Sequence, residues 1–542
     1  MSANDNHHHN YLRKFFVAWA HVKSISKRFV SNLGERRRLD SIYLKSLARA
    51  PKNFDGVILA DGLWDNPNHF FRLFLYLSAL DESRKMQRVA FVRNRGSGPQ
   101  KRTLKALGFT KFIKVSDLPQ EKFLQEASEI LRNITTHKEL LDIQLPGNLP
   151  AYIFYDDALK RARHPQPNLS DPCWKLALAQ AMSASAQMNN VLNSEDVRHV
   201  VLSHPWGLPY GAMAWAAISQ KIVTCHLTGY AEGIRIRRFS SLDDFATPVE
   251  HLTYKEFKNL STEQKAKLIS IGHGEFKRRI TGQTSDINSR YAFNEQLRQD
   301  SLVTRKQLIG DDSRPIVLIC AHVWFDFPHT FAMRNFTDFL DWMQFTIAQI
   351  VNIKNVIWLL KPHPTEKWYG GFQLSQLVPK GLEHIITLAH DFDQATALDL
   401  CDAVVTCHGT AGIEAGIFGR PVLSADRNYY SEWPFVISAH SRDQYGQLLG
   451  NISQMPRTST ETTKAAIAFF SAALSQPSEN DQRIRLHCDS FGTILYKELK
   501  VEFLQNKEGI EEEIARIKLW CTTKSGSYAT YQIISSLLEM AD

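Results

Sequence analysis

Short runs of apolar residues alternate with longer segments of helical periodicity along most of the chain. In the first half, strand-like runs occupy 56–62, 88–93, 111–115, 151–157, 197–204 and 221–227. Segments with helical spacing lie between several of these runs, at 69–80, 100–109 and 173–192, and Asn66-Pro67 supplies a start for the first. Because parallel strands are joined by crossover helices, this alternation predicts βαβ units in which helices cover both faces of a parallel sheet.

The pattern changes near residue 246 and resumes near 315. Residues 246–313 are polar and helical in character, without a run fit for a buried strand. A second series of strand-like runs occupies 315–322, 355–364, 384–390, 402–409 and 420–426, and after about 460 the chain is predicted to be helical to its end. We predict an α/β protein with two doubly wound, Rossmann-like domains and a helical C-terminal tail. Its predicted parts are a basic amphipathic segment 1–50, a first domain 51–310, a second domain 311–460 and C-terminal helices 461–542.

Composition places the chain among soluble globular proteins. It has 542 residues, of which 44% are hydrophobic and 22% charged, and this length is too great for one hydrophobic core. We expect no membrane span, because no apolar run reaches the roughly 18–20 residues that a span needs. The short apolar run 15–22 is followed by no cleavage pattern, so we expect no signal peptide. Seven scattered cysteines without paired spacing favour a reducing cytoplasm over a disulfide framework or a zinc site.

Positive charge is concentrated near the N-terminus. Residues 1–40 hold eight basic and three acidic side chains, a surplus of five in a chain whose net charge is +8. The apolar residues of this segment recur at spacings of about three and four: Leu12, Phe15, Phe16, Trp19, Val22, Phe29, Val30 and Leu33. A basic helix with an aromatic stripe suits an anionic membrane surface, which we expect residues 11–38 to contact. The alternative is a helix docked on its own domain. Nucleic acid is not expected as a partner, because no recognised binding motif accompanies the charge.

The candidate chemistry of the second half lies where its strands end. Lys361-Pro362-His363-Pro364 follows the second strand, and the prolines restrict the backbone so that Lys361 and His363 project from a stiff loop. A cation and a hydrogen-bond donor held there suit a phosphate or diphosphate. The alternative is a rigid turn with a solvated lysine.

Three further polar residues, His322, Asp326 and His329, follow the first strand of the same series. Their spacing matches no zinc signature, so we predict no metal and assign His322 to the donor site.

A second motif lies between the fourth and fifth strands of this series. "CHGTAGIEAGIFGRPVL", residues 407–423, has the pattern strand, tight turn, short helix, turn, strand. Its small residues allow a ligand to approach the backbone, and the helix start together with the Thr410 hydroxyl favours an anion. Glu414, in the first helical turn, is placed to accept hydrogen bonds from a ribose. The motif is neither a Walker loop nor a GxGxxG fingerprint, and tight packing alone also demands glycine.

The pair of motifs resembles the capsular polysaccharide biosynthesis family of GT-B glycosyltransferases, which includes Kdo transferases. Sialyltransferases carry a similar His-Pro motif. The resemblance is clearest over about 315–440 and implies a GT-B fold. It also implies that the His-Pro loop and the Gly-Ser/Thr turn hold the phosphate and ribose of a nucleotide-sugar donor, often a CMP-sugar. Carried over by position, the implied donor-binding residues are Lys361, His363, His408, Gly409, Thr410 and Glu414.

The first half is expected to supply the acceptor site and a catalytic carboxylate. Glu232-Gly233-Ile234-Arg235 resembles an Asp-Gly motif of the same family, with glutamate in place of aspartate. A carboxylate there can deprotonate the acceptor hydroxyl or attack the anomeric carbon. The rival carboxylates are Asp61, Asp156 and Asp157, which can equally belong to a turn or cap a helix. The basic residues Arg235, Arg237 and Arg238 either bind an anionic acceptor or form a solvated face.

The sequence therefore favours a GT-B glycosyltransferase that transfers a hexosyl or ulosonic acid residue, with a CMP-sugar such as CMP-Kdo as the favoured donor. The expected acceptor is a growing bacterial surface polysaccharide or glycolipid, and no separate cofactor is expected. The protein is expected to be cytoplasmic, on the inner face of the plasma membrane if the N-terminal segment binds lipid. Alternatives are a nucleotide-sugar 2-epimerase, a teichoic-acid-type polyol-phosphate transferase, and a non-catalytic binding scaffold.

Overall fold

The computed structural model divides the chain into two compact units. One comprises Met1–Val115 and Gln482–Lys524, and the other comprises Ser116–Asp481 and Ser525–Asp542. The structure describes residues 34–43, 54–80, 85–94, 96–116, 119–228, 234–246, 252–283, 289, 292–293, 305–331, 333–366, 372–474, 484 and 495–529. The predicted domain boundaries near 50, 310 and 460 stay a prediction.

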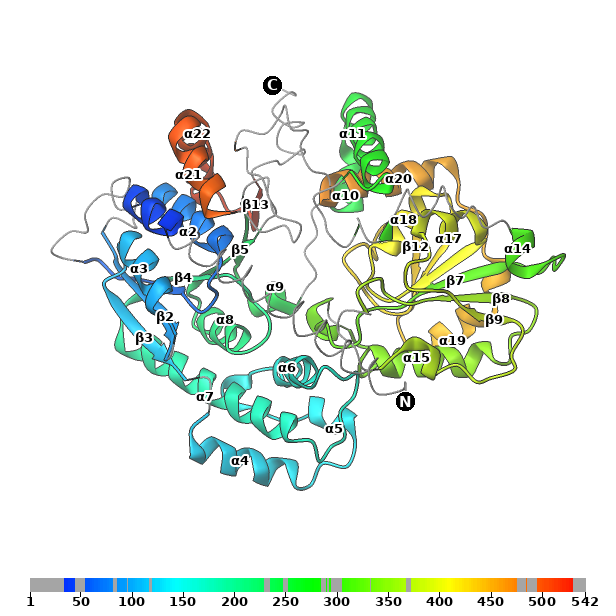
Figure 1. The fold of residues 1–542 in the computed structure, drawn as a ribbon, viewed down its shortest axis with the longest axis horizontal. Coiled ribbons are helices and arrows are strands. Elements are labelled where there is room, and N and C mark those ends of the chain that lie inside the picture. The colour runs from blue at the N-terminus through cyan, green and yellow to red at the C-terminus, as the bar shows by residue number, and fades with distance from the viewer. Residues whose placement is uncertain are drawn as a thin grey trace, which may run out of the picture. The chain divides into compact units, whose positions relative to one another are not determined.

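The first unit is a parallel three-stranded arrangement with helices packed on it (Figure 1). Asn66 caps α2 by accepting the Asn68 backbone N–H at 2.8 Å, and Pro67 takes the first helical position, as the sequence predicts. Helix α22 packs against α2. The elements of the first unit are β1 (Val57–Asp61), α2 (Pro67–Ala79), β2 (Gln87–Arg93), α3 (Gly98–Ala106), β3 (Lys111–Val115), α21 (Tyr496–Gln505) and α22 (Lys507–Cys521).

The described end of the N-terminal basic segment is a helix over 34–43 that is docked on this unit. The Arg36 guanidinium is buried, lies 2.8 Å from the Asp65 carboxylate and donates to the Thr103 hydroxyl at 2.9 Å. Arg36 is therefore a packing residue, not part of a solvated or lipid-facing surface. The aromatic stripe of residues 12–33 lies outside the described residues, so membrane contact stays a prediction. None of the helices in the described ranges is long and apolar enough to cross a membrane.

The second unit begins with a group of helices followed by a small sheet. Strands β4 and β5 are parallel, whereas β6 runs antiparallel to β5 and to β13. Helix α6 packs against α7, which also contacts α4 and α8. The elements are α4 (Glu121–Leu131), α5 (His137–Leu141), η2 (Pro146–Asn148), α6 (Tyr152–Ala162), α7 (Pro172–Ser194), β4 (Val197–Leu202), α8 (Tyr210–Ser219), β5 (Val223–Thr228), β6 (Arg235–Phe239), α9 (Leu242–Ala246) and β13 (Ser527–Ala529).

Two sequence predictions are wrong in this region. The strand predicted over 151–157 is the first part of α6, because a short apolar run fits a buried helix as well as a strand, and packing against α7 decides. The tail predicted to be helical to its end contains β13, which adds to the edge of β6. Neither the packing of α6 on α7 nor the pairing of β13 with β6 leaves a local signal in the sequence.

The remainder of the second unit is built on a six-stranded parallel sheet in the order β12-β11-β10-β7-β8-β9. Helices α15 and α19 lie on one face, and α17, α18 and α20 lie on the other (Figure 1). The elements are α10 (Tyr254–Asn259), α11 (Thr262–Ile280), α14 (Arg305–Ile309), β7 (Ile316–Cys320), η3 (Pro328–Phe331), α15 (Phe339–Ile350), β8 (Ile357–Lys361), η4 (Leu374–Gln376), β9 (Ile385–Thr387), α17 (Gln394–Leu400), β10 (Ala403–Thr406), α18 (Ala411–Ile417), β11 (Val422–Ser424), β12 (Val436–Ser438), α19 (Arg442–Gly450), η5 (Ile452–Gln454) and α20 (Thr460–Leu474). The predicted α/β class with parallel sheets is confirmed.

The strand order of this sheet reverses between β7 and β10. From β7 the chain proceeds outward to β8 and β9, then returns to β10 on the other side of β7. In open parallel sheets, the crevice at such a reversal, at the carboxyl ends of the strands, is where ligands bind.

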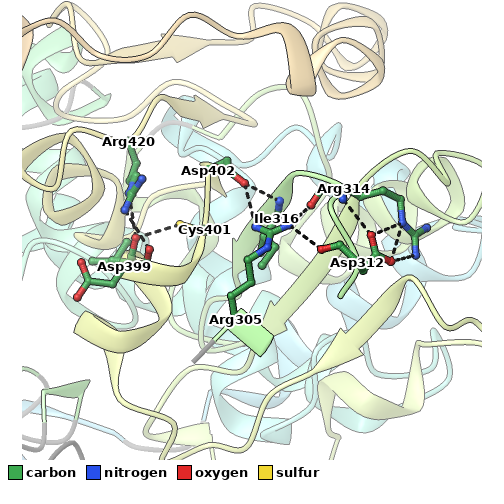
Figure 2. Close-up of polar contacts among 9 residues, drawn as sticks. Arg305, Asp312, Arg314, Ile316, Asp399, Cys401, Asp402 and Arg420 are labelled. Carbon is green, nitrogen blue, oxygen red and sulfur yellow. Dashed lines mark hydrogen bonds and ion pairs between the residues drawn. The ribbon is translucent and has the colours of Figure 1, made fainter. Parts of the chain in front are cut away.

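At the amino ends of the same strands, polar contacts join the segments that lead into the sheet (Figure 2). The Asp402 carboxylate accepts the Ile316 backbone N–H at 2.9 Å and lies 3.6 Å from Arg305. Arg314 pairs with Asp312 at 2.6 Å and donates to a backbone carbonyl at the end of the neighbouring loop.

Candidate functional site

Four of the predicted donor-site residues gather at the carboxyl ends of three adjacent strands. His322 follows β7, Lys361 ends β8 with His363 two residues later, and His408 follows β10. The rings of His322 and His363 have centroids 5.9 Å apart. Phe339, at the start of α15, stacks on His322 at 4.3 Å and meets the His408 ring at 5.6 Å. Phe339, which the sequence analysis did not single out, therefore joins His322 and His408, and His363 lies against His322.

Lys361 is buried with its ammonium unsatisfied. The residue is 3% exposed, and its Nζ has no hydrogen-bond partner among the residues that the structure describes. Burial lowers the pKa of Lys361, while the nearby Cys320, Asp393 and Glu414 act to raise it. A buried ammonium is costly unless it is paired, so this position is suited to an anionic ligand that supplies the missing contact.

His363 is oriented by the turn that follows it. Its Nδ1 accepts the Thr365 backbone N–H at 3.3 Å and lies 2.8 Å from the Thr365 hydroxyl. Because Nδ1 acts as an acceptor, the proton of the neutral ring lies on Nε2, which is then a donor. Burial, together with His322 and Lys361, lowers the pKa of His363 to about 3. In the ligand-free protein the ring is neutral at pH 7, and a bound anion favours its protonation.

The turn between β10 and α18 is tightly packed. The Gly409 carbonyl accepts the Tyr430 hydroxyl at 2.7 Å, and a Cβ at Gly412 would lie 2.5 Å from that hydroxyl oxygen. The glycine at 412 is therefore required by packing, whether or not a ligand binds nearby. Thr410 directs its hydroxyl toward the Glu414 carboxylate at 3.5 Å.

Glu414 is engaged by an arginine that the sequence analysis did not identify. Its Oε1 accepts hydrogen bonds from Nε and Nη2 of Arg279 at 3.1 and 3.0 Å, and both side chains are buried. Arg279 comes from α11, in the polar stretch that carried no motif. A contact between Glu414 and a ribose stays a prediction. The same carboxylate would have to accept from the ribose and from Arg279.

The predicted catalytic carboxylates are in different settings. Glu232 lies outside the described residues. Asp61 ends β1 in the first unit, fully buried, and its backbone carbonyl lies 3.0 Å from His69 Nε2. Asp157 lies in α6, where it pairs with Arg161 and accepts the Leu208 backbone N–H at 3.2 Å. Burial raises the pKa of Asp157 against the effect of Arg161. These contacts give Asp157 a packing role.

The two predicted acceptor-site arginines are on β6. Arg235 Nη1 donates to the Ala473 carbonyl at 3.1 Å. Arg237 donates to the Asp244 carbonyl and lies 4.7 Å from the centre of the Phe239 ring. Burial lowers the pKa of Arg237 to about 10. Arg235 thus ties β6 to the end of α20 and Arg237 holds the nearby α9, and a contact of either arginine with an acceptor stays a prediction.

The segment after β7 is tied to α6 by three polar contacts. Asp156 bonds to His329, Lys160 lies 2.8 Å from Asp326, and the Tyr155 hydroxyl donates to Asp338 at 2.6 Å. The described residues contain no group of three or more His, Cys, Asp or Glu side chains placed to hold a metal ion.

Comparisons with known proteins show only distant similarity. No protein-family model and no curated protein matches the chain. Among solved structures, it is similar to UDP-GlcNAc 2-epimerase from Neisseria meningitidis bound to UDP-GlcNAc, with 10% identity, coverage of 77% of this chain and 97% of that one, and a TM-score of 0.24.

Two further similar structures are of KpsC from Thermosulfurimonas dismutans. The β-Kdo 2,4 transferase has 13% identity, covers 51% of this chain and 79% of that one, and has a TM-score of 0.30. The β-Kdo 2,7 transferase has 11% identity, covers 59% and 89%, and has a TM-score of 0.31. Similarities this distant carry no argument about chemistry, which has to come from the residues of the site.

Proposed function

We propose that the protein is a GT-B-type glycosyltransferase that moves a sugar from a nucleotide-sugar donor to a glycan or glycolipid acceptor. The observation that supports this most is the buried Lys361 ammonium, which has no partner among the described residues, on the same loop as the Nε2 donor of His363 at the carboxyl end of β8. A nucleotide phosphate would satisfy both groups. The CMP-sugar preference, with CMP-Kdo as the favoured donor and a bacterial surface polysaccharide as product, rests on the motif resemblance alone.

The proposal is tested by screening CMP, CDP, UDP and GDP for thermal stabilisation of the full chain. A nucleotide at about 100 times its dissociation constant adds roughly 2.7 kcal/mol to the free energy of unfolding. We expect at least one of the four to raise the melting temperature, and His363→Ala and Thr410→Ala to reduce the shift. If none of the four shifts it, the proposal is wrong. Exchange of the hydrogen at sugar C2 without an acceptor would instead favour an epimerase.

We also propose that residues 1–33 bring the enzyme to an anionic membrane surface. Removal of residues 1–33 keeps Arg36 and its contact with Asp65, so the first unit should stay folded. We expect the full chain, but not the shortened one, to float with phosphatidylglycerol liposomes, and the binding of the full chain to weaken with salt. Equal flotation of both chains would contradict this.

A further inference from the structure

The Asp156 carboxylate and the His329 imidazole form a buried pair. His329 Nδ1 lies 2.6 Å from Asp156 Oδ1, and the His329 backbone N–H donates to Asp156 Oδ2 at 3.1 Å. The side chains of His329 and Asp156 are only 6% and 5% exposed. Both oxygens of the Asp156 carboxylate, on α6, therefore hold His329, on η3. The ring cannot rotate without losing the shorter of these bonds.

The opposite edge of the imidazole is left unsatisfied. His329 Nε2 is buried and has no hydrogen-bond partner in the described part of the chain. The Tyr152 ring stacks on the imidazole at 5.7 Å and the Tyr155 ring meets it edge-on at 5.7 Å. An unmade buried hydrogen bond costs about 1–3 kcal/mol, and a ligand hydroxyl at Nε2 would supply the missing contact.

His329 lies in η3, on the segment that leaves the carboxyl end of β7 together with His322. Burial and His322 lower the pKa of His408, and the charge of His329 adds to that lowering; Asp338 and Asp426 add to the effect of Asp156, which raises the pKa of His329 against burial. Asp338 directly precedes Phe339, which contacts the rings of His322 and His408. The imidazole is thus on the carboxyl-end side of the sheet, within electrostatic range of the groups that the donor phosphate would meet.

We propose that His329, oriented by Asp156, is the general base that takes the proton of the acceptor hydroxyl through Nε2. This rests on the proposed glycosyl transfer. An Nδ1–H bond to a carboxylate leaves the lone pair of the neutral ring on Nε2, the arrangement that a base needs. The acceptor oxygen forms its bond to the anomeric carbon as its proton passes to Nε2. The bond from that carbon to the nucleotide phosphate breaks, and its electron pair goes to the phosphate oxygen of the departing nucleotide.

The Asp156–His329 pair predicts how turnover falls at low pH, which is the acid limb of the pH–rate profile. Burial lowers the pKa of His329, but the charge and hydrogen bond of Asp156, with Asp338 and Asp426, outweigh burial and raise it above 6.5. His408, Tyr152 and Tyr155 are the other titratable groups that face the ring. A base must be neutral to act, so turnover should be lost as pH falls through the raised value. Asp156→Asn removes the main cause of the raised pKa and should move the limb to lower pH.

The test uses the full chain with CMP-Kdo and UDP-GlcNAc as probe donors and water in place of the acceptor hydroxyl, and nucleotide release is the readout. His329→Asn keeps an N–H near the Nδ1 position for Asp156 but has no Nε2. We expect release to fall about 10²- to 10⁴-fold, the range of acid–base catalysis, with CMP and UDP affinities unchanged. Deuterium exchange at the histidine C2 position, followed by mass spectrometry, reports the pKa of His329 without turnover. It should be above 6.5 in the native chain and lower in Asp156→Asn.

A matched control separates lost chemistry from lost stability. Asp171 caps α7, the helix packed on α6, by accepting the Cys173 backbone N–H at 2.8 Å. Asp171→Asn should keep native release. If the native chain binds no nucleotide, the proposed function fails and this assignment fails with it. If nucleotide binds and His329→Asn releases it at near-native rates, only the assignment to His329 is wrong. If the native chain binds nucleotide but releases none from either donor, the deuterium-exchange measurement decides. A His329 pKa at or below 6.5 would then overturn the assignment to the Asp156–His329 pair.

Discussion

Lys361→Met should weaken nucleotide binding and at the same time stabilise the ligand-free protein. Methionine keeps the apolar stem of the side chain and removes an ammonium that is 3% exposed and unpaired in the described structure. Loss of a buried, charge-assisted hydrogen bond to phosphate costs about 1.5–3 kcal/mol, so we expect an affinity about 10- to 150-fold lower. Relief of the unsatisfied group should add about 1–3 kcal/mol to the free energy of unfolding without nucleotide.

These opposite signs distinguish a binding residue from a packing residue. A lysine that only packs would lose stability on substitution and leave nucleotide affinity unchanged. Titration calorimetry measures the nucleotide affinity, and urea unfolding measures the free energy of unfolding. Lys354→Met is the matched control, because Lys354 is exposed in the loop before β8, and its substitution removes the same charge away from the site. Unchanged affinity in Lys361→Met would return the Lys-Pro-His-Pro loop to a structural turn.

Glu232→Gln should abolish most transfer while leaving nucleotide affinity near native. Glutamine keeps the shape of the side chain but can neither take a proton nor attack carbon. We expect turnover to fall by at least about 10²- to 10⁴-fold. Such a loss would make Glu232 either the base in place of His329 or the group that attacks the anomeric carbon ahead of the acceptor. Attack by Glu232 predicts in addition a donor-derived adduct that intact-mass analysis finds on the native chain and not on Glu232→Gln.

The rival carboxylates provide the comparison for Glu232. Asp157→Asn should lower stability more than turnover, because Asp157 pairs with Arg161 and holds the Leu208 backbone N–H. Asp61→Asn should also act on folding, since Asp61 is fully buried at the end of β1. Near-native turnover of Glu232→Gln beside an inactive Asp61→Asn or Asp157→Asn would move the catalytic role to that aspartate.

The sequence predicts the C-terminal sheet well because its strands are apolar runs ended by proline, glycine or histidine. It fails where tertiary contacts decide. The run 151–157 is apolar enough for a strand, yet it is part of α6, and β13 exists only as a partner of β6. The same limit applies to the site. Lys361 and His363 are visible as a motif, whereas the Arg279–Glu414 and Asp156–His329 pairs join residues more than 130 positions apart.

A nucleotide phosphate is proposed to bind at the carboxyl ends of β8 and β10. The most direct test is a crystal structure of the full chain with the nucleotide that stabilises it most. We expect a phosphate oxygen within hydrogen-bonding distance of Lys361 Nζ and of His363 Nε2, about 2.7–3.2 Å for each pair. A nucleotide bound elsewhere, or a phosphate that contacts neither group while Lys361 stays unpaired, would contradict the account.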